Sequence, residues 1–261
     1  MSPVELAHDA EGDGPPLVLI HAGVCDRRMW EPQWRALTER FRTVRCDLRG
    51  FGDSPLPPES FNNADDVLRL LDALGIERAS VVGSSFGGRV ALELACTWPE
   101  RVERLVLLCS AWEGVDPDPA LASFAAEENR LLEEDDIDGA VDLNVRTWLG
   151  PDAPDTSRSL VERMQHRAFE VQLEAGDDIA DEERDVDPGA VGARALMVSG
   201  ALDFPRFRQI AAALADRIPG GEHLELDWAG HLPSLERPDP VTELLLRSLD
   251  TSPSPEAPKS K

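Results

Sequence analysis

The chain has 261 residues, of which 42% are hydrophobic and 29% are charged, and its formal net charge at pH 7 is −24. This length is enough for one compact domain with a large core. The negative charge disfavours nucleic acid and anionic membrane surfaces as partners, because both would repel the protein.

The first residues, MSPVELAHDAEGDG, are polar and acidic and do not resemble a signal peptide. No apolar run is long enough to span a bilayer. We therefore expect a cytoplasmic protein without membrane contact. The four cysteines lack the spacing of metal ligands and are expected to be buried free thiols: Cys25, Cys46, Cys96 and Cys109.

Apolar strand-like segments alternate with amphipathic helical segments along most of the chain. Strands are expected at residues 4–10, 16–23, 43–48, 77–85, 104–111, 193–200 and 222–230. Helices are expected at residues 30–41, 62–76 (with Asn63 as its N-cap), 89–98, 205–217 and 240–249. This alternation predicts an α/β fold with a mostly parallel sheet, covered by helices on both faces.

Residues 112–190 interrupt the alternation. They are acidic, lack strand signals and carry apolar residues at the spacing of short amphipathic helices. A helical insertion at the ligand edge of a sheet suggests a lid over a site. We expect residues 1–111 and 191–250 to form the core, and residues 251–261 (TSPSPEAPKSK) to be a disordered tail.

The segment VVGSSFGGRV (81–90) joins an expected strand to an expected helix. Gly83, Ser85 and Gly87 fit the pattern G-x-S-x-G, in which the central serine occupies a strained turn that exposes its hydroxyl. Larger flanking residues would clash, which explains the glycines. The pattern predicts Ser85 as a nucleophile and Ser84 as a small residue that shapes the turn.

A serine nucleophile needs a base, and His231 follows the last expected strand and precedes a helix. The other histidines lie in an early polar segment, towards the end of the strand at 16–23 in the turn assigned to the oxyanion site, in the insertion and at a strand start: His8, His21, His166 and His223. For the acid that orients the base we prefer Asp203, because the order serine, aspartate, histidine is typical of this architecture. Glu113 is the main rival, since it follows a neighbouring strand, and Asp227 is a weaker one.

Acyl transfer also needs donors for an oxyanion. The backbone N–H of Phe86 directly follows the expected nucleophile at the start of a helix, where the helix dipole favours negative charge. The second donor is expected from the turn HAGV, at Gly23.

With the strand, the serine turn, the residue order and the oxyanion turn together, the sequence resembles the α/β-hydrolase superfamily, and within it small serine esterases and enol-lactone hydrolases. The segments HAGVCDRRMWEPQ (21–33), DLRGFGDSP (47–55) and GHLPSLERP (230–238) are similar to the family's oxyanion, loop and histidine segments. The resemblance implies an α/β-hydrolase fold with a helical lid inserted after the sixth strand. Ala22 stands where the family usually has glycine, and the amino terminus is short enough for the family's first edge strand to be missing.

The resemblance implies a serine hydrolase that cleaves a small carboxylic ester or lactone through an acyl-enzyme intermediate, with Ser85, His231 and Asp203 as its catalytic residues. The alternatives are a carbon–carbon bond hydrolase or a non-hydrolytic enzyme on the same fold, and a ligand-binding protein with a vestigial triad. A serine at this position excludes a haloalkane dehalogenase, which needs aspartate there.

The candidates for the substrate pocket are Val24, Cys25, Phe86, Trp112, Trp148 and Phe204. Packing in the core or the lid is the alternative for each of them. GSSFGG is no dinucleotide fingerprint and no ligand cluster is evident, so no metal and no cofactor are expected. The expected partner is a small-molecule substrate, with the protein as a monomer or homodimer.

Overall fold

The computed structural model describes residues 6–57, 59–175 and 181–250 of the chain. The tail predicted at 251–261 lies outside the described residues. Within them, no helix combines the length and hydropathy needed to cross a bilayer.

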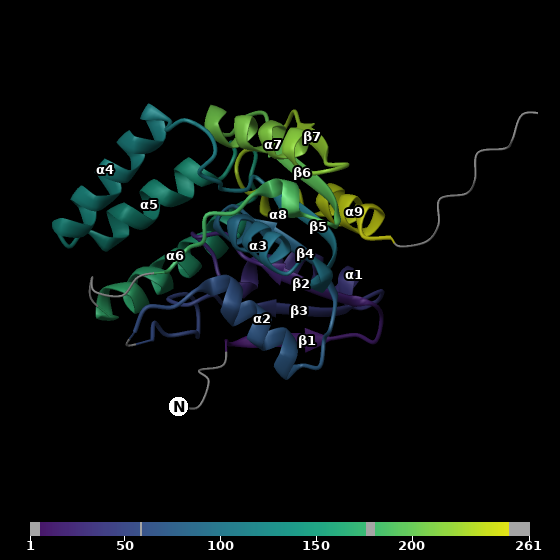
Figure 1. Ribbon diagram of the computed structural model, residues 1–261. Helices are drawn as coiled ribbons and strands as arrows, with labels where there is room; N and C mark the ends of the chain where they lie inside the picture. The colour runs from purple at the N-terminus through teal and green to yellow at the C-terminus, as the bar shows by residue number, and fades with distance from the viewer. Residues whose placement is uncertain (1–5, 58, 176–180, 251–261) are drawn as a thin grey trace, which may run out of the picture.

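A seven-stranded sheet forms the centre of the molecule (Figure 1), in the order β1-β3-β2-β4-β5-β6-β7. The antiparallel edge strand β1 pairs with β3, and the other neighbours run parallel. The strands are β1 (His8–Glu11), β2 (Pro16–Ile20), β3 (Arg42–Cys46), β4 (Ala79–Ser84), β5 (Val102–Leu108), β6 (Arg194–Gly200) and β7 (Glu222–Leu226).

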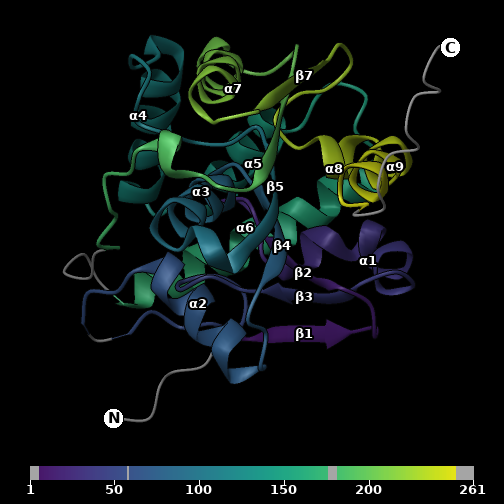
Figure 2. The ribbon, with the colours of Figure 1, turned by 45° about the vertical axis from the view of Figure 1, so that its right-hand side comes forward.

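Helices cover both faces of this sheet (Figure 2). On one face lie α2 (Asn63–Ala73), α3 (Phe86–Thr97) and α7 (Pro205–Arg217), and on the other α1 (Glu31–Thr38), α8 (Pro233–Glu236) and α9 (Pro238–Ser248). Short 3₁₀ turns are η1 (Arg27–Trp30), η2 (Pro99–Arg101) and η3 (Pro188–Ala190). Because both faces are covered, the central strands are apolar without alternation, and every residue of β4 is buried.

The insertion contains three helices between β5 and β6: α4 (Pro119–Glu133), α5 (Ile137–Trp148) and α6 (Asp155–Ala175). They lie together at one end of the sheet, as Figure 1 shows. We call these three helices the helical insertion. It follows the fifth strand along this chain rather than the sixth, because β1 alone precedes β2 in the described residues.

The start of α2 differs by one residue from the sequence prediction. The N-cap is Asn62, not Asn63, because Asn62 has an extended backbone and its side chain accepts a hydrogen bond from the Asp65 N–H at 2.8 Å. The Asn63 side chain instead donates to Asp181, at 2.9 Å. Both asparagines could serve as a cap by sequence, and the backbone conformation selects one.

All four cysteines are free thiols. Cys25, Cys46 and Cys109 are buried as expected, whereas Cys96 on α3 is half-buried. Burial raises the pKa of Cys46 to about 12 and that of Cys96 to about 12. These thiols therefore stay protonated at neutral pH and are poor nucleophiles.

Candidate active site

Ser85 lies at the sharp turn between β4 and α3, with a left-handed backbone at φ 52° and ψ −115°. This conformation is strained for a residue with a side chain. The turn is held by backbone bonds on both sides, since the Ser85 N–H donates to the Leu108 carbonyl at 2.9 Å and its carbonyl accepts from Ala111 N at 3.0 Å. The expected strand–turn–helix geometry is therefore present.

The glycines around Ser85 are required by close backbone approach. A Cβ on Gly83 would lie 2.3 Å from the Gly87 carbonyl oxygen, and one on Gly87 would lie 2.3 Å from the His21 carbonyl oxygen. A Cβ on Gly88 would lie 2.6 Å from the hydroxyl of Ser110. The first turn of α3 can thus pack directly on the ends of β2 and β5.

The two adjacent serines have different environments. Ser85 is half-buried, and its hydroxyl oxygen lies 2.7 Å from Nε2 of His231. Ser84 is the last residue of β4 and is fully buried, and within the described residues its hydroxyl has no hydrogen-bond partner. Of the two hydroxyls, that of Ser85 is the one that contacts a histidine in the described residues.

His231 connects Ser85 to an acid. Its Nδ1 lies 2.7 Å from Oδ2 of Asp203, and the side chains of both residues are almost completely buried, with 3% and 1% exposed. The Phe204 N–H donates to the other Asp203 oxygen at 2.7 Å. Asp203 therefore holds the proton on Nδ1 and leaves Nε2 free to accept the serine proton.

The two rival acids lie elsewhere. The side chain of Glu113 is 82% exposed and pairs with Arg206 at 3.3 Å. Asp227 is exposed on the turn after β7. The structure brings His231 together with Asp203 and with neither rival.

A buried carboxylate that sequence reasoning missed fixes the backbone around His231. Glu236 is 4% exposed and accepts hydrogen bonds from the N–H groups of Gly230 at 2.8 Å and Leu232 at 3.1 Å, on either side of the histidine. The backbone of Gly150, two residues after the end of α5, also lies close to this carboxylate, and its N–H acts on the pKa of Glu236 in the same direction as those two donors. Burial raises the pKa of Glu236, and these three donors oppose the shift. Glu236 lies in the segment GHLPSLERP, but nothing in that segment indicates its burial.

The expected oxyanion donors lie side by side. A Cβ on Gly23 would lie 3.4 Å from Cβ of Phe86, so the turn after β2 faces the first residue of α3. As the first helical residue, Phe86 has an N–H without an acceptor in its own helix.

His21 braces this turn. Its Nδ1–H donates to the Ala22 carbonyl at 2.8 Å, and its Nε2 accepts from the Leu48 N–H at 2.9 Å. Burial lowers the pKa of His21, so the ring is neutral, as this bonding pattern requires. The arrangement ties the turn to the loop after β3.

The expected pocket residues have different surroundings. Val24 and Phe204 are half-buried, whereas Trp112 and Trp148 are 8% and 7% exposed. Cys25 has no exposed surface, so it does not line the pocket as predicted, because its side chain packs within the core. Trp148 packs on His231 with ring centroids 4.6 Å apart, a contact that the sequence did not indicate.

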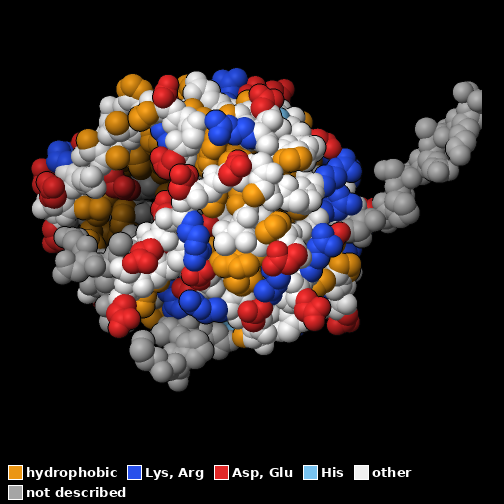
Figure 3. Space-filling view, in the orientation of Figure 1, with side chains coloured by type: hydrophobic (Ala, Val, Ile, Leu, Met, Phe, Trp, Pro, Cys, Tyr) orange, Lys and Arg blue, Asp and Glu red, His pale blue; other side chains and the backbone are white. Residues whose placement is uncertain are grey.

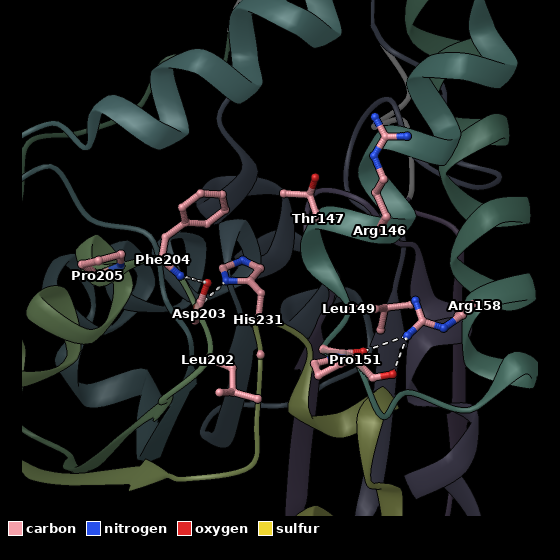
Figure 4. Close-up of a pocket in the computed structure, with 12 residues that line it drawn as sticks. Arg146, Thr147, Leu149, Pro151, Arg158, Leu202, Asp203, Phe204, Pro205 and His231 are labelled. Atoms are coloured by element: carbon pink, nitrogen blue, oxygen red, sulfur yellow. Dashed lines mark hydrogen bonds and ion pairs between the residues drawn. The ribbon is translucent and has the colours of Figure 1, made fainter.

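A cavity of about 470 Å³ opens beside the histidine and its acid (Figure 4). The end of α5 and the link to α6 form one wall, and the segment after β6 forms the other. Its lining includes Thr147, Arg158, Leu202, Phe204 and His231. In the space-filling view, the molecule is hollowed at the side of the helical insertion, with hydrophobic and acidic side chains around the hollow (Figure 3).

Cys109, Asp203 and His231 are the one group of potential metal ligands that the described residues bring within reach of one another, with their ligand atoms within 4.8 Å. Asp203 and His231 are already bonded to each other, and burial raises the pKa of Cys109, so that the thiol keeps its proton. The donor set therefore suits proton transfer better than metal binding.

Known proteins share this architecture. A protein of Caulobacter segnis that is provisionally named a carbamate hydrolase is 29% identical over 252 residues, covering 91% of this chain and 92% of that protein. A thermophilic esterase from Thermogutta terrifontis has a similar structure, with a TM-score of 0.80 and 26% identity over 95% of this chain and 94% of its own. The enol-lactonase from Burkholderia xenovorans LB400 has a TM-score of 0.75 and 26% identity, covering 94% and 96% of the two chains.

The family model described as alpha/beta hydrolase fold matches residues 15–238, which include β2 to β7 and the helical insertion. Strands β2 to β7, the serine turn and the histidine segment all lie within this match. The chain belongs to the α/β-hydrolase family, and it is a hydrolase.

Proposed function

We propose that this hydrolase cleaves a small carboxylic ester or lactone through an acyl-enzyme intermediate. The observation that carries the proposal is a pair of hydrogen-bond contacts through one imidazole. His231 Nε2 lies 2.7 Å from Ser85 Oγ, and His231 Nδ1 lies 2.7 Å from Asp203 Oδ2. A serine hydroxyl that is hydrogen-bonded to an imidazole, which an acid orients in turn, is an activated nucleophile.

The residues suggest the following steps. Ser85 attacks the carbonyl carbon while His231 takes its proton, and the N–H groups of Phe86 and Gly23 stabilise the oxyanion. His231 then donates the proton to the leaving alkoxide, which departs as the alcohol. Water, deprotonated by His231, attacks the acyl carbon, and His231 then returns this proton to Ser85 Oγ as the acyl–oxygen bond breaks, which releases the acid and free Ser85. Asp203 stabilises the imidazolium in both halves.

A carbamate is the second candidate substrate class, favoured by the similarity to the Caulobacter segnis protein. The same attack on a carbonyl would apply. Comparing hydrolysis of p-nitrophenyl acetate, a simple lactone and an aryl carbamate would rank the three classes.

The first test compares Ser85→Ala with Ser84→Ala in the hydrolysis of p-nitrophenyl acetate. Ser85→Ala should lower kcat by about 10⁴-fold or more, because it removes the nucleophile. Ser84→Ala is the matched control and should keep parent-like activity, because the Ser84 hydroxyl is buried and unpaired within the described residues. If Ser84→Ala lost activity and Ser85→Ala kept it, the nucleophile would be Ser84.

Labelling by a fluorophosphonate probe separates an enzyme from a binding protein. The parent should be labelled at Ser85, and Ser85→Ala should not. A parent that resists labelling and hydrolyses none of the three substrate classes would overturn the proposed function.

A further inference from the structure

Trp148 covers His231 as part of an aromatic cluster. It is the last residue of α5, and its ring lies 4.6 Å from the imidazole at an interplanar angle of 45°. Phe207 lies 4.2 Å from the same imidazole, while Phe124 and Phe204 pack on the indole at 4.9 Å and 5.5 Å. The helical insertion therefore contacts the candidate base itself.

A buried polar group fixes the orientation of the indole. The Trp148 Nε1–H donates to Oδ1 of Asn144 at 2.8 Å, and Asn144 is 1% exposed. The Asn144 amide donates in turn to the Ala140 carbonyl at 3.0 Å and to Glu128 on α4 at 2.5 Å. Asparagine is a poor residue for a buried helix interior, so this bonding gives it a specific task.

The link after Trp148 is fixed as well. The backbone of Gly150 lies against Glu236, the carboxylate that holds the backbone on both sides of His231. A Cβ on Gly150 would lie 2.3 Å from a Glu236 oxygen, so the approach is close. The Glu236 carboxylate thus lies between the link that follows Trp148 and the backbone around His231, and helps to set their relative position.

We propose that Trp148 is a positioning residue for the catalytic base and that Asn144 acts through it by orienting the indole. The indole restricts the His231 ring to the orientation in which Nε2 faces Ser85. This inference rests on the proposed function, because it requires His231 to act as the base. It assigns Trp148 to that base rather than to the substrate pocket.

Kinetics can distinguish a role of Trp148 in positioning the base from a role in binding substrate. A pocket wall binds substrate, so its loss raises KM, whereas a residue that positions the base changes kcat at nearly constant KM. In p-nitrophenyl acetate hydrolysis, Trp148→Leu should lower kcat on the order of tenfold, because the imidazole loses a group that holds its orientation. Trp148→Phe keeps an aromatic face and should restore most of this loss. Raised KM with unchanged kcat in Trp148→Leu would overturn the inference.

Asn144→Leu tests the hydrogen bond to the indole. It should lower kcat in the parent background but have little further effect when combined with Trp148→Leu, because the two residues act as a unit. Asn129→Leu is the matched control, since Asn129 is exposed on α4 of the same insertion. Additive effects of Asn144→Leu and Trp148→Leu would contradict action through the indole.

The rate of fluorophosphonate labelling distinguishes the two proposals. It reports the reactivity of Ser85 without a chosen substrate. If the parent is not labelled, the proposed function is wrong. If the parent is labelled and a folded Trp148→Leu protein reacts at the same rate, the further inference alone is wrong. Thermal unfolding of each variant shows whether it is folded at the assay temperature. If Trp148→Leu is not folded, Asn144→Leu takes its place, because it too should be labelled more slowly than the parent.

Discussion

In the candidate site, burial and hydrogen-bond partners separate residues that look alike in the sequence. Ser84 and Ser85 are neighbours in sequence, yet one is fully buried and unpaired in the described structure and the other touches His231. Likewise, Asp203 and Glu113 both follow strands at the same edge, but only Asp203 is buried against the imidazole. The tautomer of His231 depends on this one contact.

Asp203→Asn and Glu113→Gln should therefore differ strongly. An amide at position 203 can stabilise the wrong tautomer of His231, and loss of the carboxylate leaves the imidazolium uncompensated. We expect kcat for p-nitrophenyl acetate to fall roughly 10⁴-fold in Asp203→Asn. Glu113→Gln should remain close to the parent, because Glu113 is exposed and pairs with Arg206. Parent-like turnover in Asp203→Asn would refute the assignment of the acid.

At the scale of elements, the position of α3 determines the serine turn. The helix begins directly after Ser85, and its first turn lies against the ends of β2 and β5. The sequence predicted this arrangement well, because the glycine spacing and the flanking apolar segments are local features. It could not predict that the end of α5 contacts His231, because that contact depends on how two distant segments pack.

Gly87→Ala should destabilise the protein, because the first turn of α3 lies directly against the backbone at the end of β2. The new Cβ would lie 2.3 Å from the His21 carbonyl oxygen and 2.6 Å from that of Ile20, and both are backbone atoms with little freedom to move. We expect a loss of about 1–3 kcal/mol in the free energy of unfolding, measured by urea denaturation.

Gly192→Ala provides the control for this substitution. At Gly192 the nearest atom to a new Cβ is 3.7 Å away, an ordinary contact. Its stability should match the parent or slightly exceed it, because alanine has less conformational freedom in the unfolded chain. Equal stability of the two variants would contradict the close-packing argument.

At the scale of the whole molecule, the dominant property is charge. The chain carries 50 acidic and 26 basic residues other than histidine. Arginines pair with many of the acids, and buried examples such as Arg49–Asp66 lie beneath the surface. The net charge of −24 gives the folded state a long-range repulsion, which the more expanded unfolded chain relieves.

Salt should therefore stabilise the protein. Screening over about 10 Å at 0.1 M ionic strength weakens the repulsion among distant acids, while short-range pairs lose less. We expect Tm, measured by differential scanning fluorimetry, to rise between low salt and about 0.1 M NaCl. KCl should have the same effect if screening is the cause. A fall in Tm over this range would mean that the ion pairs contribute more than the excess charge.

The sequence by itself determined the fold class, the strand and helix order, and the candidate residues Ser85, Asp203 and His231, because each depends on a local pattern or on order along the chain. Tertiary structure decided which acid reaches the imidazole, which asparagine caps α2, that Cys25 is enclosed in the core, and that Trp148 and Glu236 surround His231. These outcomes depend on the packing of segments far apart in sequence. Burial and contact are properties of the assembled core, and no single segment encodes them.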